Sequence, residues 1–231
     1  MSAQDARLKL RSLGSPEAAA STARFFRTGP GEYAEGEKFI GVRVPVLRAV
    51  ARQFRALSLQ DIESLLSSVI HEERHLALLI LVLQVSACDE SRRKILYDFY
   101  LNHTRLISNW DLVDCSAPHV VGSFLLYRSR KPLFRLARSK SLWERRISIV
   151  STQHFIRHND VSDTFLISRS LLGDSEDLIH KATGWMLREA GHRAPDLLLS
   201  FLDSHATEMP RTMLRYAMER LPAELRLRYR K

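Results

Sequence analysis

The chain has 231 residues and a hydrophobic content of 45%, enough to bury a sizeable core, which excludes a disordered protein. Its 35 Lys and Arg against 26 Asp and Glu give a formal net charge of +9, so we expect a polyanionic partner such as nucleic acid. Its two cysteines, Cys88 and Cys115, exclude a disulfide framework, and each lies in an apolar helical pattern typical of an inert buried thiol.

The N-terminal segment, residues 1–11, is polar and charged, and so does not read as a secretory signal. The longest apolar stretch, residues 76–85, is too short to span a bilayer. We therefore expect a cytoplasmic protein that has no membrane partner.

Apolar side chains recur three and four residues apart along most of the chain, as at Leu76, Leu79, Ile80 and Leu83, and no segment shows the alternation of a strand. Proline and glycine interrupt this pattern at short intervals, at residues 16, 29–31, 45, 132, 173, 195, 210 and 222. The sequence therefore predicts an all-α protein of many short helices joined by tight loops.

Polar helix starts that turn apolar recur about every 35 residues, near Arg74, Trp110, Arg145 and His180, and again at Arg211. Such spacing is typical of a helical-repeat solenoid, in which equivalent helices line one concave surface. We expect one such domain over residues 1–231. The alternative is a coincidence among amphipathic helices, with no shared surface.

Basic residues are concentrated in residues 128–146, where Glu144 is the only acid. An ordinary solvated helix face would give the same composition. Together with the net charge, this run favours a surface that follows the phosphates of DNA.

Two pairs of residues place an indole beside a charged group on one helix face. Trp110 and Asp114 are one turn apart, and Trp185 and Arg188 are similarly spaced. A carboxylate beside an indole suits a site at which positive charge develops. Tryptophans in helical repeats are more often packing residues, and Asp111 in the same segment is expected to cap its helix or to pair with an arginine.

The segment from His71 to His75 matches the pattern of zinc hydrolases, in which two histidines one turn apart bind Zn²⁺ and a glutamate activates water. The apolar residues 76–85 that follow hold no third ligand. We therefore expect no metal and no zinc hydrolase activity here.

Four motifs in order resemble the AlkD type of alkylpurine DNA glycosylase, a DNA alkylation repair family built of HEAT-like repeats. They are FIGVRVP at 39–45, WDLVD at 110–114 followed by Gly122, WERR at 143–146, and KATGWMLRE at 181–189. The resemblance implies an all-α, right-handed α-α superhelix of HEAT-like repeats with a concave basic groove.

The resemblance also implies roles for individual residues. Asp114 matches the catalytic aspartate, and Trp110 and Trp185 match the indoles that flank the deoxyribose of the damaged nucleotide. The expected DNA-binding residues are Arg146, Arg188, Arg145, Lys181, Arg43 and Arg48. The chain departs from the best-known form at Asn109, where another aromatic residue can stand, and this puts lesion preference and rate in doubt.

The implied activity is excision of N3- and N7-alkylpurines from duplex DNA, with no cofactor, by a monomer. Such bases are cationic and leave readily, so one ionised carboxylate is enough to stabilise the oxocarbenium-like sugar and orient water. The AlkD type acts without a base pocket, and no sequence feature demands one.

Two other functions stay open. One is a DNA-binding member of the same superfamily without catalysis, and the other is a helical-repeat scaffold for RNA or an acidic protein. The basic residues 226, 228, 230 and 231 at the C-terminus either reach flanking phosphates or are simply mobile.

Overall fold

The structure is a computed structural model that describes residues 1–229 and divides the chain into two compact units, Met1–Val120 and Val121–Lys231. Within the described residues, regular structure is helical apart from one isolated β-bridge between Lys38 and Ile70. The predicted all-α fold is confirmed. Arg230 and Lys231, the end of the predicted basic tail, lie outside the described residues.

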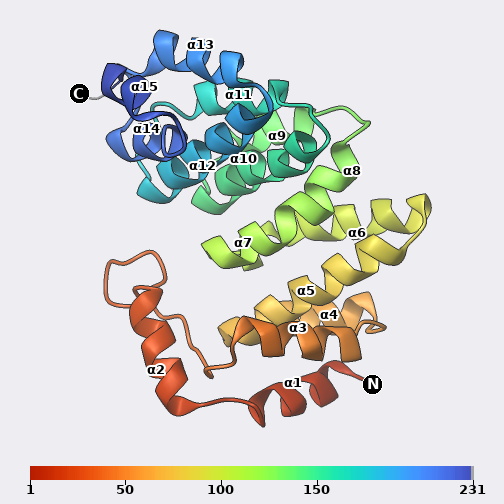
Figure 1. The fold of residues 1–231 in the computed structure, drawn as a ribbon. Coiled ribbons are helices and arrows are strands. Elements are labelled where there is room, and N and C mark those ends of the chain that lie inside the picture. Colours follow the sequence, from red (N-terminus) through yellow and green to blue (C-terminus); the bar gives the residue numbers. More distant parts are fainter. Residues whose placement is uncertain (230–231) are drawn as a thin grey trace. The chain divides into compact units, whose positions relative to one another are not determined.

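The helices of the first unit are labelled in Figure 1. They are α1 (Ala3–Arg11), α2 (Pro16–Phe25), α3 (Val44–Gln53), α4 (Leu59–Leu66), α5 (His71–Ala87), α6 (Glu90–Asn102), a 3₁₀ turn (Thr104–Leu106) and α7 (Trp110–Ala117). The long helix α5 is the centre of this unit, since α3, α4, α6 and α7 all pack against it.

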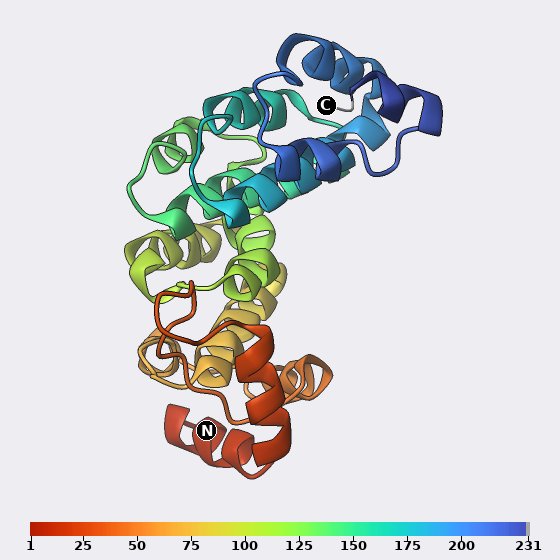
Figure 2. The same cartoon turned by 90° about the vertical axis from the view of Figure 1, so that its left-hand side faces the viewer.

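A π-helical turn at Pro118–Gly122 joins α7 to the helices of the second unit. These are α8 (Ser123–Leu125), α9 (Lys131–Leu136), α10 (Leu142–Arg157), α11 (Ser162–Ser170), α12 (Asp177–Arg193), α13 (Pro195–His205), α14 (Arg211–Ala217) and α15 (Ala223–Arg228). Here α12 is central and packs against α10, α11, α13 and α14, and the order α10, α12, α14 can be followed in Figure 2.

The predicted repeat register holds within each unit. Arg74, Trp110, Arg145 and His180 each lie in the first turn of a helix, and Arg211 begins α14. Equivalent helices are also neighbours: α5 packs against α7, and α12 lies between α10 and α14. Among the helices of residues 1–229, none is long and apolar enough to cross a membrane.

Serine and aspartate side chains begin several of these helices. Ser2 and Asp5 form a capping box on α1, Ser58 caps α4, and Asp89 caps α6 by accepting from the backbone N–H of Arg92. Local sequence therefore sets these boundaries, and the buried apolar faces set the packing.

The α12–α14 contact is unusually close at Gly184. A Cβ atom there would lie 2.4 Å from the backbone oxygen of Met213 and 2.6 Å from Cβ of Tyr216. Only a residue without a side chain lets the two helices approach this closely.

We expect Gly184→Ala to lower the free energy of unfolding by about 1–3 kcal/mol, because the added methyl group meets backbone that cannot yield easily. Gly173→Ala is the matched control, since a Cβ there meets nothing within 4 Å. Urea denaturation measures both, and equal stability of the two variants would contradict the close α12–α14 packing.

Candidate functional site

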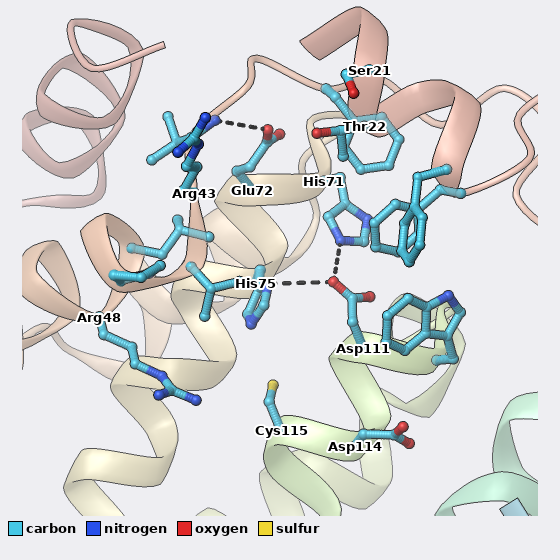
Figure 3. A pocket seen from close by; sticks show the side chains of 18 residues that line it. Ser21, Thr22, Arg43, Arg48, His71, Glu72, His75, Asp111, Asp114 and Cys115 are labelled. Carbon is cyan, nitrogen blue, oxygen red and sulfur yellow. Dashed lines mark hydrogen bonds and ion pairs between the residues drawn. The ribbon is translucent and has the colours of Figure 1, made fainter. Parts of the chain in front are cut away.

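The first unit contains a cavity of about 740 Å³ (Figure 3). Its lining residues come from α2, the segment that leads into α3, α3 itself, α5 and α7: Ser21, Thr22, Phe25, Phe26, Phe39, Val42, Arg43, Val44, Pro45, Leu47, Arg48, His71, Glu72, His75, Trp110, Asp111, Asp114 and Cys115. Sequence patterns did not demand a cavity, because its walls come from segments far apart in the chain.

Aromatic rings form one wall of the cavity and fix Trp110. Phe26 stacks on the indole at 5.1 Å between ring centroids with an interplanar angle of 10°, and Phe25 meets it edge-on at 6.0 Å. The indole Nε1 donates a hydrogen bond of 3.2 Å to the hydroxyl oxygen of Tyr33. Trp110 therefore has a packing role and also presents part of its surface to the cavity.

The polar side of the cavity holds a close group of two histidines and an aspartate. Nε2 of His71 lies 2.8 Å from Oδ2 of Asp111, and Nδ1 of His75 lies 3.4 Å from the same oxygen. His71 and His75 begin α5, and Asp111 is the second residue of α7. Within residues 1–229, Asp111 pairs with these histidines and not with an arginine. Its Oδ1 also accepts a hydrogen bond from the backbone N–H of Leu112 at 2.9 Å, so the expected capping role is met in part.

These contacts shift the ionisation of all three groups. Burial lowers the pKa of His71, but the hydrogen bonds to Asp111 and Glu37 outweigh it and bring that pKa to about 9. Burial likewise opposes protonation of His75, and the electrostatic effects of Cys115 and Asp111 raise its pKa to about 10. Burial raises the pKa of Asp111, yet the two histidines hold it well below its usual range.

The glutamate of the zinc hydrolase pattern points away from this group. Glu72 accepts hydrogen bonds from the backbone N–H groups of Ile40, Gly41 and Val42, the shortest being 2.7 Å to Gly41. Gly41 has a φ of +79° and lies against α2, so Glu72 holds a tight backbone turn. It is not placed to activate water.

Asp114 lies one turn beyond Asp111 on α7 and lines the same cavity, half-buried, as does Cys115 (Figure 3). The structure therefore brings Trp110 and Asp114 to one cavity, as their spacing predicts. Cys115 faces the cavity beside His75 and is half-buried, as is Cys88, so the expectation of buried thiols is only partly met.

Asn109 is fully buried and is the N-cap of α7. Its side-chain oxygen accepts from the backbone N–H of Trp110 at 2.8 Å, and its Nδ2 lies 3.4 Å from Glu37. An asparagine directly before a helical pattern is a preferred N-cap. The sequence held this signal, although the resemblance emphasised the missing aromatic residue.

The predicted DNA-binding residues of the second unit all have protein partners. Arg146 is buried and donates to the carbonyl oxygen of Leu178 at 2.6 Å. The other pairs are Arg145 with Asp174 at 2.6 Å, Lys181 with Asp177 at 2.7 Å, and Arg188 with Glu189 at 3.0 Å and with Glu219. Trp185 is half-buried on α12 in this unit. Phosphate contacts by these residues stay a prediction.

Arg43 and Arg48 differ from those cations. Both are exposed and line the cavity of the first unit, and the side chain of neither makes a hydrogen bond or ion pair with another part of residues 1–229. They are available to an anion at the cavity without breaking an internal contact.

Sequence reasoning missed the role of Asp111 and of Glu37. Glu37 hydrogen-bonds Nδ1 of His71 at 3.0 Å and pairs with Arg74 at 2.5 Å. No local signal links residue 37 or 111 to residue 71, because each contact joins segments more than 30 residues apart. The sequence does show that this helix begins with charged residues, but not that they are buried.

Comparisons with known proteins agree with this architecture. The sequence profile of the family described as DNA alkylation repair enzyme matches residues 6–221. A predicted DNA alkylation repair enzyme from Enterococcus faecalis has a similar structure, with a TM-score of 0.71 and 17% identity over 91% of this chain and 97% of that chain.

A second similar structure belongs to a family related to the HEAT-like repeat DNA glycosylases and described as having affinity for branched DNA. Its TM-score is 0.60, with 14% identity over 90% of this chain and 83% of that chain. No curated protein sequence matches this chain.

The chain has the fold of the all-α proteins with HEAT-like repeats, as expected. More specifically, the chain belongs to the DNA alkylation repair enzyme family, whose profile covers nearly its whole length.

The ion pairs around Asp111 give a pH dependence of stability. The folded pKa values of His71 and His75, about 9 and about 10, exceed the ordinary value of 6.5. Their stabilisation is therefore fully present below pH 6.5 and is lost as the pH rises through 9 to 10.

In the parent protein, the free energy of unfolding should fall as the pH rises through 9 to 10. We expect this fall to be much smaller in the double variant His71→Gln/His75→Gln, measured by urea denaturation at several pH values in buffer with EDTA. His103→Gln is the control, because His103 pairs with Glu63 outside the cavity. A double variant with the same decline as the parent protein would show that these histidines are not charged in the folded state.

Proposed function

We propose that this protein is a DNA glycosylase that hydrolyses the N-glycosidic bond of N3- and N7-alkylated purines in duplex DNA, the first step of base excision repair. The observation that carries the proposal is the placement of Asp114 and Trp110 on one cavity, in a member of the DNA alkylation repair enzyme family. Exposed Arg43 and Arg48 on the same cavity supply charge for a DNA backbone.

Of the two aspartates on α7, Asp114 is the better candidate for the reaction. Asp111 is committed to His71 and His75, and using it would break both ion pairs. Asp114 has no part in that group and lies half-buried at the cavity. A carboxylate there is placed to meet a positively charged sugar.

The lesion supplies much of the driving force. An N3- or N7-alkylpurine already carries a positive charge and leaves without protonation, so no general acid is required. As the bond to C1′ breaks, ionised Asp114 stabilises the oxocarbenium-like sugar and orients the attacking water. Trp110, held by Phe26 and Tyr33, offers a preorganised aromatic surface to that sugar. Neutral lesions are mostly spared, because their bases are poor leaving groups.

We expect Asp114→Asn to reduce release of N7-methylguanine or N3-methyladenine from duplex DNA at least about 100-fold, since the amide lacks the negative charge. Asp98→Asn is the matched control, because Asp98 lies half-exposed on α6, does not line the cavity and pairs with Lys94. Chromatography of the released base measures both. Undiminished release by Asp114→Asn would contradict its catalytic role.

A second function is favoured by one comparison, the similar structure from a family with affinity for branched DNA. It would use the same basic residues without base release. Binding of a four-way junction by the parent protein, with no release from any alkylated duplex, would support this function. Absence of DNA affinity at low salt would favour the scaffold role instead.

Arg43 and Arg48 give a separate prediction about DNA binding. If each contacts one phosphate, Arg43→Gln/Arg48→Gln should reduce the slope of log K against log salt by about 1.8. Arg52→Gln/Arg55→Gln is the matched control, since those exposed arginines do not line the cavity. Fluorescence anisotropy with a duplex of fixed length measures the slopes, and equal slopes for both variants would remove the two arginines from the interface.

A further inference from the structure

The group formed by His71, His75 and Asp111 has a feature that base release does not use. One possible metal-ligand atom from each residue lies within 4.8 Å of the other two. The histidines are one turn apart on α5, and Asp111 supplies from α7 the third ligand that the residues after His75 lack. All three line the cavity.

The distances suit a small divalent cation. Tetrahedral Zn²⁺ binds nitrogen and oxygen at 2.0–2.2 Å, which places neighbouring ligand atoms about 3.3 Å apart. Here Oδ2 of Asp111 lies 2.8 Å from Nε2 of His71 and 3.4 Å from Nδ1 of His75. The ligand atoms of the two histidines lie within 4.8 Å of each other, so side-chain movements of up to about 1.5 Å would bring all three atoms to the spacing of a tetrahedral ion.

Glu37 provides the outer contact that metal-binding histidines usually have. Its carboxylate lies 3.0 Å from Nδ1 of His71, which leaves Nε2 to face Asp111 and an ion. Arg74 holds Glu37 in turn. Glu37 therefore fixes the orientation of the His71 ring from the side opposite Asp111.

His75 is buried in the same group, with its Nδ1 towards Asp111. Its side chain is 4% exposed, and its Nε2 is buried with no hydrogen-bond partner in residues 1–229. Leaving such a nitrogen unsatisfied is unfavourable.

We propose that His71, His75 and Asp111 bind one Zn²⁺ ion, with a fourth coordination position open to the cavity. That position takes water or an anionic oxygen, and Arg43 and Arg48 stand at the same cavity. Because Glu72 is bonded to the backbone of residues 40–42, the site is a metal-binding site without the water-activating glutamate of zinc hydrolases.

The test is metal titration of the whole protein, purified without a histidine tag and stripped with a chelator that is then removed. We expect one Co²⁺ per chain, with the intense visible absorption of a tetrahedral complex, displaced by one equivalent of Zn²⁺. Less than a tenth of an equivalent bound at saturating metal would overturn the proposal.

Variants and spectroscopy locate the ion. His75→Gln should weaken Zn²⁺ binding at least about 100-fold, and Glu37→Gln about 10- to 100-fold. His103→Gln, outside the group, should leave affinity unchanged, and circular dichroism confirms the fold of each variant. Unchanged affinity in folded His75→Gln would overturn the assignment.

X-ray absorption at the zinc edge needs no variant. We expect only nitrogen and oxygen neighbours at 2.0–2.2 Å with the scattering signature of two imidazoles. A sulfur neighbour near 2.3 Å would instead place the ion at a cysteine such as Cys115 and contradict the proposed ligands. These measurements follow the metal itself, so their outcome is independent of base release.

Discussion

The first unit depends on a buried run of polar residues at the start of α5. His71, Glu72, Glu73, Arg74 and His75 are each at most 8% exposed, and together they join α5 to several other segments. Glu73 pairs with Arg7 and Arg11 of α1, and Arg74 reaches Glu37 and the hydroxyl of Ser108. Because buried charges are costly without partners, loss of any one segment would leave a charge uncompensated. This helix start therefore holds α1, α7 and the segments before α3 and α7 in place.

The same interactions give different roles to two aspartates that are three residues apart on α7. The histidines draw Asp111 towards α5, and this contact fixes the rotation of α7 about its own axis. Asp114, one turn further along, then shares the cavity with Trp110. Asn109 supports this arrangement from the helix end by capping α7 and contacting Glu37. A structural ion pair thus positions a neighbouring carboxylate that takes no part in the pair.

The sequence predicted the helices, their register and the shared face of Trp110 and Asp114, because these follow from periodicity within one helix. It did not predict that Asp111 meets His71 and His75, since that contact depends on how α5 and α7 pack. The histidine pattern was correctly placed at a helix start, but its third partner lies on another helix and was sought only along the chain. Burial of Arg146 was likewise hidden in a run that reads as a basic surface.

The formal net charge overstates the number of cationic side chains that can bind a DNA phosphate without breaking an internal ion pair. Arg145 is 14% exposed beside Asp174, which is 5% exposed, so freeing this guanidinium would leave a buried carboxylate without its partner. Lys181 and Asp177 are an exposed pair within one helix, and such pairs are weak enough for a phosphate to replace the carboxylate. Arg43 and Arg48 can bind a phosphate without giving up an internal ion pair. The predicted DNA-binding residues should therefore contribute unequally to phosphate binding. The excess positive charge of residues 128–146 is a poor measure of the surface available to DNA.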